Sequence, residues 1–133
     1  MKQSPKVGTI GRRQFRVEDA HGIALGGTGG VRVLATPWLL WFLEHAAREA
    51  LADLLEPGEI SVGVHVDIDH LAATPIGQDV TCQARVVHSD GPLISFQLEA
   101  HDQHELISRG HHKRRVVEID RIARRVQRKT DGS

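Results

Sequence analysis

Tyrosine is absent from this chain of 133 residues, and three phenylalanines and two tryptophans are its only large aromatic side chains. Stacking surfaces for single-stranded nucleic acid would therefore be poorly supplied. Charge of one sign is not in excess either, because 17 Lys and Arg balance 17 Asp and Glu. A neutral chain lacks the overall field that marks an obligate binder of nucleic acid or membrane surfaces. We therefore expect neither nucleic acid nor a membrane among its partners.

Cysteine and long apolar runs are also scarce. The single Cys82 excludes an intramolecular disulfide and is typical of a reducing compartment. No apolar run approaches the length of a membrane span, and residues 1–11 lack the apolar core of a signal peptide. The sequence thus predicts a cytoplasmic protein, and its length predicts a single domain over residues 1–133.

Hydrophobic periodicity divides the chain into one long helix and several strands. Thr36-Pro37 marks the helix start, because a threonine hydroxyl can cap the first turn and proline suits the first helical position. Alternating apolar residues predict strands further along the chain. In order, we expect a strand at 7–17, a glycine-rich loop at 21–30, residues 31–34 leading into a helix between Ala35 and Leu55, a half-buried strand at 61–69, strands at 80–88, 94–100 and 106–117, and a basic helix at 121–129.

The fold class follows from the character of the long helix. This helix is apolar nearly all round, so another element must wrap it, and a curved antiparallel sheet is the only partner that the rest of the chain supplies. We therefore expect an α+β fold with a central helix. One sheet leaves edges exposed and covers a helix incompletely, which favours a homodimer.

Glu44 is the first candidate for a functional residue. It directly follows six large apolar residues, Trp38 to Leu43, which would cover every face of a helix. A carboxylate in a dry site costs several kcal/mol unless it is protonated, paired or hydrogen-bonded, and sequences seldom carry that cost without a use for it.

Hydrolysis is a reaction that the side chains of Thr36, Glu44 and His70 could catalyse together. The carboxylate can activate water or attack, the imidazole can transfer protons, and the hydroxyl can orient a substrate, which are the parts needed for hydrolysis. Each also has an ordinary interpretation. Thr36 could be a plain helix cap, His70 a strand-end histidine, and Glu44 a salt-bridged residue.

Three stretches around these residues carry a family resemblance. They read VLATPWLLWFLEHAA (33–47), LEPGE (55–59) and VGVHVDIDHLAATPIGQDVT (62–81). With AHD (100–102), GHHKRRVV (110–117) and VQRKT (126–130), they resemble the fluoroacetyl-CoA thioesterase-like branch of the hotdog-fold thioesterases. The resemblance covers roughly residues 31 to 130.

The resemblance implies a hotdog fold and a site at a dimer interface that hydrolyses an acyl thioester. It implies that Thr36 orients or polarises, that Glu44 acts as nucleophile or base, and that His70 transfers protons. Gly63 aligns with a glycine that lets the thioester approach the backbone, and Arg114 aligns with an arginine near the site. No cofactor is implied beyond the coenzyme A of the substrate.

Two features depart from the fluoroacetyl-specific pattern. Those enzymes carry an aromatic and apolar lid segment before the threonine, whereas this chain has the glycine-rich stretch 22–30, and Pro37 is typical of the wider family. We therefore expect a short or medium acyl-CoA as substrate in place of fluoroacetyl-CoA. The alternative is a non-catalytic hotdog protein that binds acyl-CoA or another small ligand.

Histidine and aspartate residues also lie close together elsewhere in the sequence and could form other sites. His65, Asp67, Asp69 and His70 could bind Zn²⁺, but four candidates on one strand rarely converge on a tetrahedral site, so we expect no metal. The remaining paired histidines are expected to be solvated polar positions: His101, His104, His111 and His112.

Glycine and arginine also cluster. The glycines of residues 26–30 lack the spacing of a phosphate loop and are better suited to a hinge or flap over a pocket. The basic residues at 113–115 and 121–129 could contact nucleic acid, contact the phosphates of coenzyme A, or form a solvated face.

Overall fold

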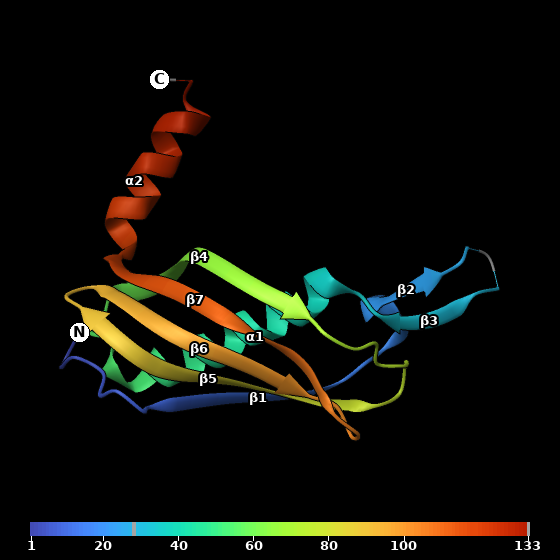
Figure 1. Ribbon diagram of the computed structural model, residues 1–133. Helices are drawn as coiled ribbons and strands as arrows, with labels where there is room; N and C mark the ends of the chain where they lie inside the picture. Colours follow the sequence, from blue (N-terminus) through green and yellow to red (C-terminus); the bar gives the residue numbers. More distant parts are fainter. Residues whose placement is uncertain (28, 133) are drawn as a thin grey trace.

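The computed structural model describes residues 1–27 and 29–132 and consists of one long helix held by a curled, five-stranded sheet (Figure 1). A two-stranded hairpin stands at one end of the molecule and a second helix at the other. The elements in chain order are β1 (Ile10–Arg16), the 3-10 helix η1 (Asp19–His21), β2 (Gly22–Leu25), β3 (Val31–Leu34), α1 (Thr36–Leu51), the 3-10 helix η2 (Ala52–Leu54), β4 (Glu59–His70), β5 (Asp79–Asp90), β6 (Leu93–His101), β7 (Leu106–Glu118) and α2 (Ile119–Thr130).

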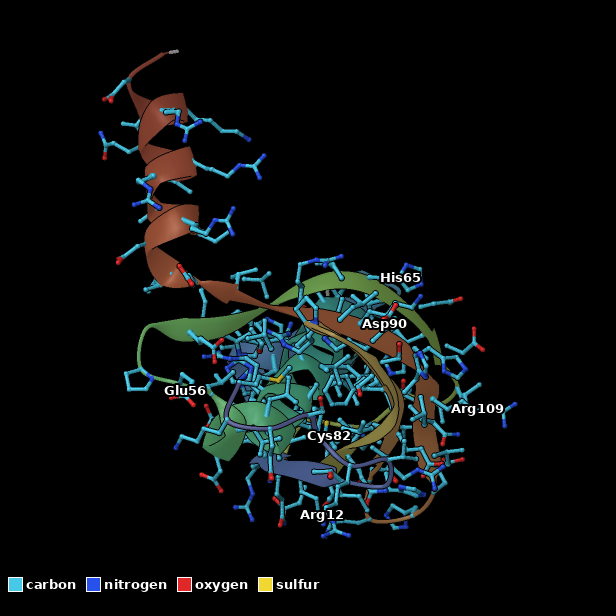
Figure 2. The ribbon with its side chains drawn as sticks, turned by 90° about the vertical axis from the view of Figure 1, so that its left-hand side faces the viewer. Arg12, Glu56, His65, Cys82, Asp90 and Arg109 are labelled. Atoms are coloured by element: carbon cyan, nitrogen blue, oxygen red, sulfur yellow. The ribbon has the colours of Figure 1, made fainter. Side chains whose placement is uncertain are left out.

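All neighbouring strands of the main sheet are antiparallel, in the order β1-β5-β6-β7-β4. The sheet curls around α1, as the end-on view in Figure 2 shows. This arrangement confirms the predicted α+β fold, with a long helix wrapped by a curved antiparallel sheet and a short basic C-terminal helix.

The core lies between α1 and the concave face of the sheet. Apolar side chains recur on α1 at spacings of three and four residues, so they form one stripe that faces the sheet. The buried residues of this stripe are Leu39, Phe42, Leu43, Ala46, Ala47, Ala50 and Leu51. They pack with inward-facing residues of the central strands, of which Cys82, Phe96 and Leu98 are fully buried.

The glycine-rich stretch is not a simple loop, and that prediction is wrong. β2 and β3 pair as an antiparallel hairpin, with Gly22 opposite Leu34 and Leu25 opposite Val31. The glycines gather at its tip, where Gly26 and Gly27 have positive φ values that glycine alone adopts readily. Residue 28 lies outside the described residues. The flanking aliphatic residues are therefore free to form short strands.

The edge strand β4 also differs from its prediction. Alternation over residues 61–69 predicts a half-buried strand, but Val64 and Val66 are 48% and 37% exposed. A β-bulge between Gly63 and His65 shifts the register, and β4 has only β7 as a neighbour among the described strands. Alternation therefore does not translate into one buried face.

Within residues 1–27 and 29–132, no helix has the length and apolar character needed to cross a bilayer.

Candidate active site

Thr36 lies at the start of α1 and does not cap it. Ala35 occupies the N-cap position with extended backbone, and no side-chain hydrogen bond closes the first turn. The predicted capping role is therefore wrong, because the helix begins one residue earlier than expected. The Thr36 hydroxyl is instead 2.8 Å from Nδ1 of His70, the last residue of β4.

His70 is held as a neutral imidazole. Burial lowers its pKa below the usual value, and the backbone of Ala72 acts in the opposite direction. With the proton on Nε2, the free Nδ1 can accept the hydroxyl proton of Thr36. The Nε2 atom is buried and has no hydrogen-bond partner among the described residues. A buried polar atom of this kind is unusual unless a ligand or another chain satisfies it.

An apolar cavity of about 460 Å³ adjoins this pair. Its walls come from the β2–β3 hairpin, the start of α1 and the segment after β4. The lining residues are Ile23, Leu25, Val33, Leu34, Ala35, Thr36, Pro37, His70, Leu71, Ala72 and Ala73. Among the described lining residues, Thr36 and His70 are the only ones with polar side chains, so the cavity presents one polar corner to an otherwise apolar guest.

Glu44 belongs to a second cluster, which is centred on the buried Arg114 of β7. The Nη1 group of Arg114 donates to Oε2 of Glu44 at 3.2 Å. Its Nε donates to the Ser61 hydroxyl at 2.9 Å, and its Nη2 donates to the Ser61 carbonyl at 2.8 Å. Burial lowers the pKa of Arg114, whereas the charge and hydrogen bond of Glu44 act to raise it. The guanidinium stays charged at neutral pH and fixes the carboxylate.

His112 completes this cluster, although it was expected to be solvated. It is only 1% exposed, and its Nδ1 lies 2.7 Å from the His65 carbonyl. A carbonyl can only accept, so Nδ1 carries the proton and Nε2 accepts from Arg114 Nη1 at 3.2 Å. Burial lowers the pKa of His112, which keeps this neutral form.

The sequence did contain a signal for His112. It lies two residues before Arg114 on the same strand, and strand side chains alternate between faces, so both must point the same way. His101, His104 and His111 are exposed, as expected.

Gly63 lies directly against the carboxylate of Glu44. A Cβ at this position would be 2.8 Å from Glu44 Oε2 and 3.2 Å from His112 Cε1, so no larger residue fits without movement. A cavity of about 300 Å³ opens here, lined by Trp41, Glu44, His45, Arg48, Ser61, Val62, Gly63 and Arg114. The structure thus brings three of the predicted site residues together in one cluster: Glu44, Gly63 and Arg114.

The two clusters are separate within one chain. Thr36 and Glu44 are eight residues apart on α1. Eight residues amount to about 12 Å along a helix and about 80° of residual rotation, so their side chains face different cavities. The single chain therefore joins Thr36 to His70 and Glu44 to Arg114, but does not join the two pairs.

The Glu44 side chain is also more exposed to solvent than its apolar sequence context predicts. Its side chain is 37% exposed, and the neighbouring Trp41 is 53% exposed. The reason is that the sheet covers α1 fully on one side, while the described residues cover the flank bearing Trp41 and Glu44 only in part.

No group of three or more His, Cys, Asp or Glu side chains that could hold a metal ion occurs among residues 1–27 and 29–132. The alternative considered from the sequence, a metal site with His65, Asp67 and Asp69 on β4, therefore has no such group among these residues.

Comparison with known proteins gives the family. The model of the FlK family, described as fluoroacetyl-CoA-specific thioesterase, matches residues 17–120. The chain belongs to this family. A fluoroacetyl-CoA thioesterase from Streptantibioticus cattleyicolor is 37% identical over 98 residues, which span 74% of this chain and 70% of the relative.

Solved structures agree with membership in the FlK family. The fluoroacetyl-CoA thioesterase FlK superimposes with a TM-score of 0.88 at 29% identity, covering 96% of this chain and 98% of that chain. A thioesterase superfamily member from Thermus thermophilus gives a TM-score of 0.86 at 24% identity over 98% of this chain and 99% of that chain. The hotdog fold and the thioesterase resemblance are both confirmed, and this FlK-family chain is a thioester hydrolase.

Proposed function

We propose that this protein hydrolyses the thioester bond of a short or medium acyl-CoA, with Thr36, Glu44 and His70 as catalytic residues. The observation that carries the proposal is the Thr36–His70 pair at the corner of an apolar cavity. Two comparisons support a CoA thioester as the class of substrate. The curated relative is named for fluoroacetyl-CoA, and a mutant of FlK has been crystallised with fluoroacetate and CoA.

The reaction adds the oxygen of water to the thioester carbonyl and breaks the carbon–sulfur bond, and the departing thiolate takes up a proton. Neutral His70 accepts and returns the proton, and Thr36 orients the reacting groups through its hydroxyl. Glu44 supplies a carboxylate held by Arg114, which can attack the carbonyl or deprotonate the water. Trapping an acyl group on Glu44 would distinguish these two routes.

Gly63 and Arg114 bind the substrate in this proposal. Because Gly63 has no side chain, a thioester can approach the backbone beside Glu44, where a Cβ would otherwise meet the carboxylate. The chemistry requires no cofactor, and coenzyme A takes part only as the carrier of the acyl group.

A homodimer would unite the two clusters. β4 is a free edge with exposed Val64 and Val66, and the flank of α1 that bears Trp41 is also uncovered. A second copy paired antiparallel to β4 would bring the His70 end of one strand toward the Glu59 end of the other. The Thr36–His70 pair of one protomer would then approach the Glu44 cluster of its partner.

The acyl group should be aliphatic and longer than two carbons. The cavity of about 460 Å³ is far larger than a fluoroacetyl group, and the hairpin contributes Ile23, Leu25 and Val33 to its wall. Aliphatic walls gain free energy from burying methylene groups, which favours a hydrocarbon chain. A cytoplasmic location is proposed as well, because the lone Cys82 is buried as a free thiol.

A panel of acyl-CoA thioesters of increasing chain length tests the proposal. Wild-type protein should release free thiol, and Glu44→Gln should lower the rate by about 100-fold or more. Glu49→Gln changes the same charge on an exposed position of α1 and should leave the rate unchanged. Thiol release no faster than in buffer across the panel would refute the proposal. Saturable calorimetric binding without turnover would instead support a non-catalytic acyl-CoA binder.

A further inference from the structure

The helix α2 leaves the body of the protein and carries most of its clustered positive charge. Figures 1 and 2 show α2 standing clear of the sheet, and Figure 2 shows nitrogen-tipped side chains along its length. A groove of about 780 Å³ lies where α2 joins the sheet. Its basic lining residues are Arg115 from β7 and Arg121, Arg124, Arg125 and Arg128 from α2.

Most of these arginine side chains have no partner among the described residues. The side chains of Arg115, Arg121, Arg124 and Arg125 make no hydrogen bond or ion pair within this part of the chain. Arg121 and Arg125 are four residues apart on α2, where like charges repel. A bound anion would relieve that repulsion.

Acidic residues do not neutralise the groove. Glu59 and Glu118 are the two carboxylates in the lining, against five arginines. Glu59 is already paired with the N-terminal ammonium of Met1 at 2.7 Å. With five arginines against two carboxylates, one of which is already paired, the groove keeps a surplus of positive charge.

We infer that this groove binds the phosphate groups of the coenzyme A moiety, which extends the proposed acyl-CoA hydrolysis and rests on it. Guanidinium groups match phosphate oxygens through paired hydrogen bonds, and coenzyme A carries a diphosphate and a 3′-phosphate. The groove also contains Pro92 and Ile122, which offer apolar surface for an adenine ring. Its volume falls in the range of small-molecule sites.

The position of the groove along β4 suits this ligand. The Ile119 N–H donates to the Gly58 carbonyl at 2.9 Å, which fixes the start of α2 beside the start of β4. Gly63 lies five residues further along the chain, a span of about 17 Å in an extended strand. That length is comparable with the pantetheine arm between the diphosphate and the sulfur. Phosphates in the groove would therefore leave the thioester within reach of Gly63 and Glu44.

Nucleic acid fits these observations less well. The chain as a whole is neutral, and α2 has no aromatic residue on which a base could stack. Nucleic-acid binding through these arginines would weaken as salt is added, so association with a DNA duplex is the competing outcome to measure.

The test compares two double variants of the full-length chain. Arg121→Gln with Arg125→Gln removes two groove cations while keeping good helix formers. Arg12→Gln with Arg85→Gln removes two exposed cations from β1 and β5 and is the matched control. Each protein is assayed with an acyl-CoA and with the corresponding acyl-pantetheine, which lacks the phosphates and adenosine.

For acyl-CoA, the groove variant should show a KM raised about tenfold or more, because charge-assisted hydrogen bonds to phosphate are lost. Its kcat should be unchanged, as should both constants for acyl-pantetheine. The control should match wild type throughout. Adenosine 3′,5′-bisphosphate should bind wild type in calorimetry and should bind the groove variant at least about tenfold more weakly.

An unchanged KM for acyl-CoA in the groove variant would overturn the inference, and so would an equal loss with both substrates. If wild type hydrolyses neither thioester, the proposed function fails, and the bisphosphate titration then decides the groove separately. Absence of bisphosphate binding to wild type would overturn the inference. Duplex binding that the bisphosphate does not displace would also overturn it.

Discussion

The Oε2 atom of Glu44 lies 2.8 Å from the place that a Cβ would occupy on Gly63. The carboxylate therefore rests against bare backbone, and the same oxygen accepts from Arg114 at 3.2 Å. One oxygen of Glu44 is thus positioned by the absence of a side chain on β4 and by a guanidinium on β7.

Replacing Gly63 with Ala should displace this carboxylate. A misplacement of about 1 Å can cost about 100-fold in rate, so Gly63→Ala should lower kcat strongly for every acyl-CoA tested. Thermal denaturation of the same variant shows whether the fold is retained. A folded variant with wild-type kcat would show that the position of Glu44 does not matter for turnover.

The Thr36 hydroxyl can be removed without loss of a helix cap. Thr36→Val keeps the shape of the side chain and should lower kcat by about 100-fold, because the contact with His70 Nδ1 is lost. Thr36→Ser keeps a hydroxyl and should retain most of the activity. Melting temperatures of all three proteins should agree closely, since Ala35 occupies the N-cap. A large drop in melting temperature for Thr36→Val alone would indicate a structural role instead.

Stability should fall in mild acid because of His112. Burial lowers the pKa of His112 in the folded protein, whereas the unfolded chain titrates near the ordinary value of about 6.5. Below that pH the unfolded state binds more protons than the folded state, so stability rises with pH through this window and levels off above it.

Urea denaturation between pH 5 and 8 measures this dependence. His112→Gln retains a donor for the His65 carbonyl and an acceptor for Arg114, and it should flatten the pH dependence. His70 also has a lowered pKa, so part of the slope should remain. A slope equal to that of wild type would rule out His112 as a contributor.

The thiol of Cys82 should be inert in the native protein. Burial on the central strand β5 raises its pKa to about 12, so the reactive thiolate is scarce at neutral pH. A colourimetric thiol reagent at pH 8 should label no cysteine until denaturant is added, when it should label one per chain. Rapid labelling without denaturant would contradict the burial of this strand.

Hydrophobic alternation in the sequence was sufficient to predict the interior strands of the sheet. The strands β5 and β6 have a real covered face, so the alternation through Val80, Cys82 and Ala84 translates directly into burial. β4 alternates as cleanly, but whether an edge strand is covered depends on a neighbour that its own residues do not specify. The β2–β3 hairpin was missed because its strands are short and its glycines dominate the composition of the stretch.

The sequence predicted which residues belong to the candidate site better than it predicted which of them contact one another. Thr36, Glu44 and His70 were found from residue chemistry and family resemblance, and their catalytic roles remain predictions. Their division into two clusters depends on helix rotation and on the position of Arg114 across the sheet. The role of His112 depends on a carbonyl at a β-bulge, which periodicity does not predict.

The fixed spacing of Thr36 and Glu44 limits how the gene for this protein can change. Insertion or deletion of one codon between them would turn all later side chains of α1 by about 100°. Such a change would pull Leu43 and Ala47 out of the core and swing Glu44 away from Arg114 in the same event. Substitution can therefore alter this part of the chain gradually, whereas a change in its length would disturb the core and the Glu44–Arg114 pair together.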